Sequence, residues 1–136
     1  MYMKLIRTNH AAKELVEHFL MNNPEINKAT LLANGYVVKV ENKIAGCFIL
    51  ERLEDRLYWL KQLYITKAEA VKLPLLVESI LALAKEQHAE EVFVNSHQIM
   101  VDIILEALQF HPQKDLTILD KHFTSEGKWW TYRITG

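Results

Sequence analysis

The chain of 136 residues has a single cysteine, Cys47, which excludes an internal disulfide and is typical of proteins of the reducing cytoplasm. No apolar run reaches the ~18 residues that a membrane-spanning helix needs. Residues 1–7 lack the apolar segment of a signal peptide, so a cytoplasmic location is expected. The net charge is −1, without a long acidic or basic run, which argues against nucleic-acid binding and against a polybasic membrane patch.

Several motifs of catalytic and metal sites are also missing. The six histidines and the cysteine show neither His-x-x-x-His nor Cys-x-x-Cys spacing, so no metal site is expected. The sequence has no Gly-x-Ser-x-Gly nucleophile motif and no Walker-type phosphate loop. What is present is a globular composition, with 50% apolar and 24% charged residues, at a length that predicts one domain over residues 1–136.

The segment from 57 to 94 predicts a strand, a helix and a second strand. Residues 57–65 are rich in aromatic and branched side chains, as expected for a buried or half-buried strand. After a connection over 66–73, Pro74 fits the first position of a helix, and apolar residues follow at helical spacing. A short β-prone run begins at Glu91. Such a βαβ unit has parallel strands, and ligands tend to bind where the strands end, here at 66–75 and 95–97.

The segments on either side extend this unit to the order β α (α) β β β α β α β β. The first helix is expected to be capped by Thr8 or Asn9, and the strands between 36 and 65 are expected to form an antiparallel meander. The other predicted elements are strands at 3–7, 36–41, 44–53, 116–123 and 129–134, a second short helix at 24–33, and a helix at about 99–108.

Four side chains in or near the βαβ unit carry groups suited to proton transfer. His97 follows its second strand and could accept a proton from an amine, or it could occupy the first turn of a helix capped by Asn95 or Ser96. Glu51, on a predicted strand, suits a water-mediated base, and Tyr58 or Tyr64 suits an acid. All of these strand residues also fit ordinary packing and surface charge. The candidate catalytic residues are therefore Glu51, Tyr58 and His97.

The order of elements, at this length, resembles the GNAT fold of acyl-CoA-dependent N-acetyltransferases. The hairpin that contains Gly46 is similar to the second and third strands of that family, and residues 60–65 with the following helix are similar to its fourth strand and third helix. Residues 102–110 resemble the helix that ends with an aromatic residue. The resemblance covers essentially the whole chain and implies a three-layer α/β/α fold of the mixed α+β class, with about seven strands and four helices.

Two functional positions depart from the pattern of that family. Its phosphate-binding loop, Arg/Gln-x-x-Gly-x-Gly/Ala, lets backbone N–H groups at a helix N-terminus approach a pyrophosphate. The matching residues 68–73 contain neither glycine nor arginine, and Glu69 would repel the phosphates. Only the positive charges of Lys67 and Lys72 could offset this repulsion; the alternative is that both are ordinary solvated surface charges. The tyrosine that protonates the leaving thiolate in many members corresponds to Leu105, which has no proton to donate.

The resemblance implies a place for acetyl-CoA or CoA between the strands at 60–65 and 92–95, with the pyrophosphate near 66–71. The expected cofactor-binding residues are Leu63, Tyr64, Ile65, Lys67, Ala68, Val71, Lys72 and Asn95. Two functions stay open, because a fold alone does not decide activity. One is transfer of an acetyl group to the amine of a small molecule or peptide, weakened by the altered loop. The other is a non-catalytic module that binds a partner or forms a homodimer.

Overall fold

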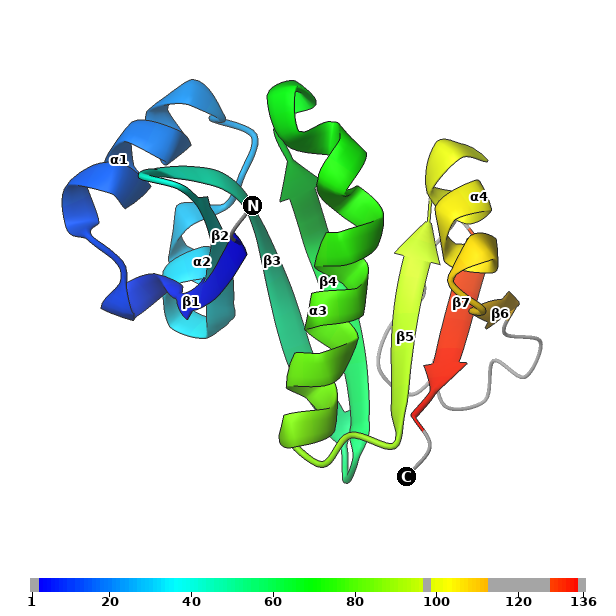
Figure 1. Cartoon of the computed structure of the whole chain (residues 1–136). Coiled ribbons are helices and arrows are strands. Elements are labelled where there is room, and N and C mark those ends of the chain that lie inside the picture. Colours follow the sequence, from blue (N-terminus) through cyan, green and yellow to red (C-terminus); the bar gives the residue numbers. More distant parts are fainter. Residues whose placement is uncertain (1–2, 97–98, 113–127, 135–136) are drawn as a thin grey trace.

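A computed structural model describes residues 3–96, 99–112 and 128–134 of the chain (Figure 1). Within these residues, four α-helices accompany one mixed sheet of seven strands in the order β1-β2-β3-β4-β5-β7-β6. The strands are β1 (Met3–Arg7), β2 (Gly35–Val40), β3 (Lys43–Glu54), β4 (Leu57–Ile65), β5 (Glu91–Ser96), β6 (His111–Pro112) and β7 (Lys128–Arg133). The α-helices are α1 (Lys13–Asn22), α2 (Lys28–Asn34), α3 (Leu73–Glu86) and α4 (Ile99–Ala107), and the 3-10 helices are η1 (Thr8–His10) and η2 (Lys67–Lys72).

The pairing of the strands confirms the predicted meander and the predicted parallel pair. Strands β1 to β4 pair antiparallel with their neighbours in sequence order. Strand β5 lies parallel to β4, because the chain returns through α3 before it re-enters the sheet. Strand β7 then lies between β5 and β6 and is antiparallel to both.

Helices cover both faces of this sheet, which confirms the predicted three layers. On one face, α3 and α4 pack on alternate residues of β2 to β5 and on Trp130 of β7. On the other face, α1 and α2 pack on β2 and β3 through a smaller cluster that includes Phe19, Leu31 and the fully buried Cys47. Trp129 joins a third cluster with Phe93, so the two adjacent tryptophans point to opposite faces, as strand alternation requires.

The starts of the first two helices differ from the prediction. Thr8 and Asn9 do not cap a helix, because they form the 3-10 helix η1, and α1 begins only at Lys13. Helix α2 begins at Lys28 because Asn27 caps it, with its side-chain oxygen 3.0 Å from the backbone nitrogen of Thr30. Helix α1, by contrast, begins after Ala12 without a side-chain cap among the described residues.

Two later segments also depart from expectation. The connection 66–73 contains the 3-10 helix η2, and Pro74 is the second residue of α3 rather than its first. His111 and Pro112, expected only to end α4, form the short strand β6. The predicted strand 116–123 lies outside the described residues.

No helix within the described residues is long and apolar enough to cross a bilayer.

Candidate functional site

Strands β4 and β5 pair along only part of their length. Their hydrogen-bonded register runs from Leu57 beside Glu91 to Leu60 beside Val94. Strand β4 continues to Ile65 beside β3, whereas β5 continues to Ser96 beside β7. The two strands therefore part after Leu60, at the edge of the sheet where α3 and α4 begin (Figure 1). We call this opening the splay.

A cavity of about 480 Å³ occupies the splay. Beyond Leu60 and Val94 the two strands no longer pair with each other, so a narrow ligand can lie between them and pair with the backbone of β4. The cavity is lined by Leu60–Ile65 of β4, Val94–Ser96 of β5, Leu73 of α3 and Val101 of α4. It is the place where parallel strands end beside helix N-termini, as the sequence predicted.

A β-bulge shapes the β4 wall of this cavity. Cys47 pairs with Tyr64 and Ile49 pairs with Lys61, so Gln62 and the next residue together face Phe48 alone. Gln62 has a φ of 52°, in the left-handed region that non-glycine residues seldom adopt. The bulge bends β4 and interrupts its pairing with β3 beside the cavity, a device that is common next to active sites.

Gly46 allows β3 to approach the wall of the cavity closely. A Cβ atom at this position would lie 2.4 Å from the carbonyl oxygen of Tyr64 and 3.3 Å from the Cα of Ile65. Any side chain here would therefore push the end of β4 away from β3. The glycine has a steric function that the hairpin pattern alone did not reveal.

The structure brings together half of the predicted cofactor-binding residues. Leu63, Tyr64, Ile65 and Asn95 all line the splay cavity. The ring of Tyr64 also packs against Phe19 of α1, with 6.0 Å between ring centroids. Tyr64 thus links the cavity wall to the helical layer that covers β3.

The other four predicted cofactor-binding residues lie on η2, before α3. Lys67, Ala68 and Val71 are exposed, and η2 does not contribute to the described wall of the cavity. Lys72 is not a solvated charge, because it forms a close ion pair with Glu69 and only 16% of its side chain is exposed. Within the chain, a carboxylate therefore already neutralises the lysine that a phosphate would need.

The N-terminus of α3 offers few donors to an anion. No side chain caps it, and the backbone N–H of Leu73 already donates to the carbonyl of Ala70. Pro74, in the first turn, has no N–H. A helix N-terminus binds phosphate through such free N–H groups, so this one is a poor phosphate site.

Glu51, a predicted catalytic residue, lies beside the splay. Its carboxylate pairs with the ammonium of Lys61, 3.3 Å away, across strands β3 and β4. The same ammonium lies 4.6 Å from the ring centroid of Trp59. Lys61 is not among the predicted site residues, although it is the only charged residue in the strand sequence LYWLKQLYI. That lone charge in an otherwise uncharged strand was the available signal.

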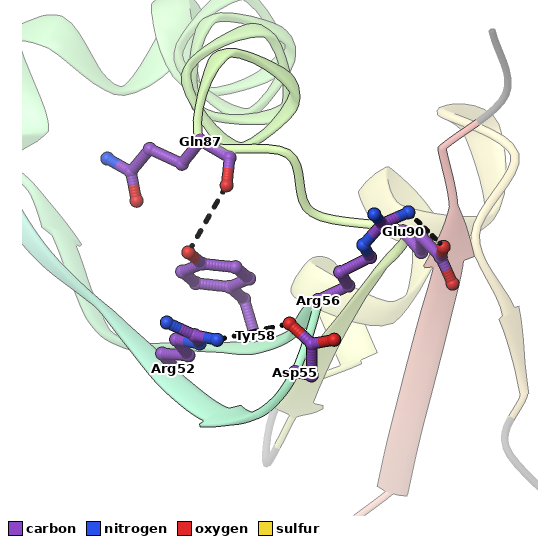
Figure 2. A network of polar contacts seen from close by, with 6 residues as sticks. All are labelled: Arg52, Asp55, Arg56, Tyr58, Gln87 and Glu90. Carbon is purple, nitrogen blue, oxygen red and sulfur yellow. Dashed lines mark hydrogen bonds and ion pairs between the residues drawn. The ribbon is translucent and has the colours of Figure 1, made fainter.

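Tyr58, the second predicted catalytic residue, lies at the closed end of the β4–β5 pair, where it faces Val92. Its hydroxyl donates to the backbone carbonyl of Gln87, 3.4 Å away, at the end of α3 (Figure 2). Glu51 faces Trp59 in the register, so alternation places Tyr58 and Glu51 on opposite faces of the sheet. His97, the third candidate, lies outside the described residues.

A second hollow, of about 680 Å³, lies at this closed end and includes Arg56, Glu90 and Arg133 in its lining. Arg56 and Glu90 form an ion pair at 2.9 Å on its rim (Figure 2). We place the candidate site in the smaller cavity instead, because it lies where two parallel strands part beside the N-termini of α3 and α4. Among the described residues, no cluster of three or more His, Cys, Asp or Glu side chains could hold a metal ion.

Comparisons with known proteins identify the fold. No protein-family model matches the chain, and no curated protein matches it. Similar solved structures include a GNAT-family acetyltransferase from Staphylococcus aureus MU50, with a TM-score of 0.73, 15% identity and coverage of 98% of this chain and 100% of that chain. An acetyltransferase from Bacillus subtilis in complex with CoA has a TM-score of 0.71 and 12% identity over 98% of this chain and 100% of that chain.

A third similar structure is a GNAT-family acetyltransferase from Elizabethkingia anophelis with acetyl-CoA bound. Its TM-score is 0.66, with 14% identity over 98% of this chain and 97% of that chain. Such low identities establish the fold alone, and the chain has the GNAT fold.

Proposed function

We propose that this chain, which has the GNAT fold, transfers an acyl group from acetyl-CoA to an amine, with acetyl-CoA held in the splay between β4 and β5. The observation that supports the proposal best is the cavity of about 480 Å³ at the point where the parallel strands β4 and β5 cease to pair with each other. The acceptor is the amine of a small molecule or peptide.

The shape and chemistry of the splay suit the pantetheine arm of acetyl-CoA. That arm is a narrow chain with two amides, and it can pair with the backbone of Leu63–Ile65 as an added strand would. Apolar side chains of Leu73 and Val101 border the same space. Asn95, on the opposite wall, offers an amide for a further hydrogen bond.

Acyl transfer requires the acceptor nitrogen to bond to the thioester carbonyl carbon, while the carbon–sulfur bond breaks and the thiolate takes a proton. Leu105 has no proton to give, and it is 1% exposed within the core. Tyr64 is the phenol in the described wall of the splay cavity, so we assign it the role of proton donor to the thiolate. Glu51, on the rim of the cavity through its pair with Lys61, is assigned to accept a proton from the amine through water.

The phosphate end of acetyl-CoA fits less well. The ammonium of Lys72 is already ion-paired with the carboxylate of Glu69, and the first turn of α3 has few free N–H groups. We therefore propose weak binding, with a dissociation constant of roughly 0.1–1 mM, equivalent to about 4–5.5 kcal/mol. Binding in the low micromolar range would show that the phosphates are held in another way.

Calorimetric titration with acetyl-CoA tests the proposal, with two variants of α4 as a matched pair. Val101→Phe places a ring at the cavity wall and should weaken binding at least roughly tenfold, a change of about 1.4 kcal/mol. Ile103→Phe, at a residue 57% exposed outside that wall, should leave binding unchanged.

Two results would contradict the proposal. One is no heat and no thermal stabilisation by acetyl-CoA at about 5 mM, since that concentration is roughly 5 to 50 times the proposed dissociation constant and should add about 1–2 kcal/mol. The other is equal loss of affinity in both variants. Failure to bind would favour the alternative, a non-catalytic module of the GNAT fold that binds another partner or forms a homodimer.

A further inference from the structure

We propose that Lys61 is an acylation site of the protein itself, modified by acetyl-CoA bound in the splay. This inference rests on the proposed function, because it needs the thioester to lie against the bulged part of β4. It names a specific nitrogen of the chain as an acceptor, in addition to the external amine.

The position of Lys61 carries the inference. It directly precedes the bulge residue Gln62, and both residues line the splay cavity. The side chain of Lys61 is 22% exposed, so the amine lies at the cavity rim rather than in open solvent. A primary amine is thus fixed beside the stretch of β4 that we propose to hold the thioester end of acetyl-CoA.

Two neighbours hold the amine in place. The carboxylate of Glu51 lies 3.3 Å from its nitrogen, and the ring centroid of Trp59 lies 4.6 Å away. The Trp59 ring is itself packed against Trp129, with 5.7 Å between ring centroids. A carboxylate and an indole are the groups that commonly bind an ammonium ion, so Lys61 occupies a built cradle for a cationic amine.

The chemistry balances without an additional reagent. The ammonium of Lys61 first loses a proton to Glu51 or to water, and its lone pair then bonds to the thioester carbonyl carbon. The carbon–sulfur bond breaks, and CoA leaves as a thiolate that takes up a proton. The nitrogen loses its second proton, so the products are N-acetyl-lysine, CoA as the free thiol and one proton in solution.

Exposed lysines that lie away from the cavity provide the reference rate of acetylation with which Lys61 is compared. Lys28 and Lys43 are exposed and lie outside the described wall of the cavity, so they meet acetyl-CoA only from solution. Lys61 would meet a bound thioester at a high effective concentration. Acetylation should therefore be faster at Lys61, although its side chain is less accessible to solvent.

The test is peptide mass spectrometry after incubation of the full chain with acetyl-CoA, quenched at several times. We expect acetylation at Lys61 at least roughly tenfold faster than at Lys28 and Lys43. Excess CoA, and separately Val101→Phe, should slow the reaction at Lys61 alone. Acetic anhydride, which needs no cofactor site, should reverse the order and favour the two exposed lysines.

The outcomes separate this inference from the proposed function. Calorimetric binding of acetyl-CoA with acetylation at Lys61 no faster than at the exposed lysines would overturn the inference and leave the acyltransferase proposal standing. Absence of binding would overturn both. Acetylation at Lys61 that excess CoA does not slow would also overturn the inference, because the donor would then come from solution.

Discussion

Replacement of Gly46 by alanine should both lower the free energy of unfolding and distort the splay. The added Cβ would lie 2.4 Å from the carbonyl oxygen of Tyr64, and real Cβ contacts essentially never fall below 3.0 Å. Because that atom belongs to the backbone, β4 must shift by more than half an ångström relative to β3. Overpacking of this kind costs about 1–3 kcal/mol, and the gain from replacing a strand glycine offsets about 0.5–1 kcal/mol.

We therefore expect a net loss of about 1–2 kcal/mol in the free energy of unfolding, measured by urea denaturation, and a fall in Tm of roughly 3–10 °C. Gly35→Ala is the matched control. Its Cβ would clash with Leu31 of α2, 2.5 Å away, so it should also destabilise the protein. Of these two variants, only Gly46→Ala should weaken acetyl-CoA binding, because the added Cβ at Gly46 meets Tyr64 whereas that at Gly35 meets Leu31. An unchanged Tm for Gly46→Ala would refute the claim that β3 and β4 are in tight contact there.

Three further predictions concern groups in or near the sheet. Burial, and secondarily the charge of Glu25, raises the pKa of Cys47 to about 12 from an ordinary 9.0. The neutral buried thiol therefore makes its full contribution to the free energy of unfolding below pH 9, and this contribution is lost as pH rises toward 12. At pH 10, wild type should have lost about 1 kcal/mol more than Cys47→Ala, and equal losses would contradict this. Tyr58→Phe removes a 3.4 Å hydrogen bond at the closed end of the β4–β5 pair, so it should lower the free energy of unfolding in urea by at most about 1 kcal/mol. It should leave acetyl-CoA affinity unchanged, and weaker binding would show that Tyr58 has a role in the site. Glu69→Gln should free Lys72 and strengthen acetyl-CoA binding roughly fivefold in calorimetry, which is on the order of 1 kcal/mol, and an unchanged affinity would exclude Glu69 as the competing group.

Much of the fold could be predicted because its signals are local. Alternating and helical apolar patterns predict the order of elements. The short turns before Leu57 predict antiparallel pairing, and the long crossover after it predicts the parallel pair. Capping was harder to predict. Asn23 and Asn27 both precede a helix-forming run, but Asn23 is buried and donates to the carbonyl of Phe19, so only Asn27 caps α2.

The candidate site was predicted less completely, because its key features depend on contacts between distant residues. The bulge at Gln62 exists only because β4 places one more residue than β3 between two fixed pairs, and no local pattern marks it. The pairing of Lys61 with Glu51 depends on the same register. The pairing of Lys72 with Glu69 requires the 3-10 turn of η2, whereas the sequence showed only an irregular connection.

The measurement that tests the proposed binding site most directly is an NMR titration of the backbone amides with acetyl-CoA. We expect the largest shift changes at Leu63, Ile65 and Asn95 on the two walls of the splay, with little change in β1 or in the hollow beside Arg56. Changes centred on Arg56, or no changes at several millimolar acetyl-CoA, would contradict the proposal that acetyl-CoA binds between β4 and β5.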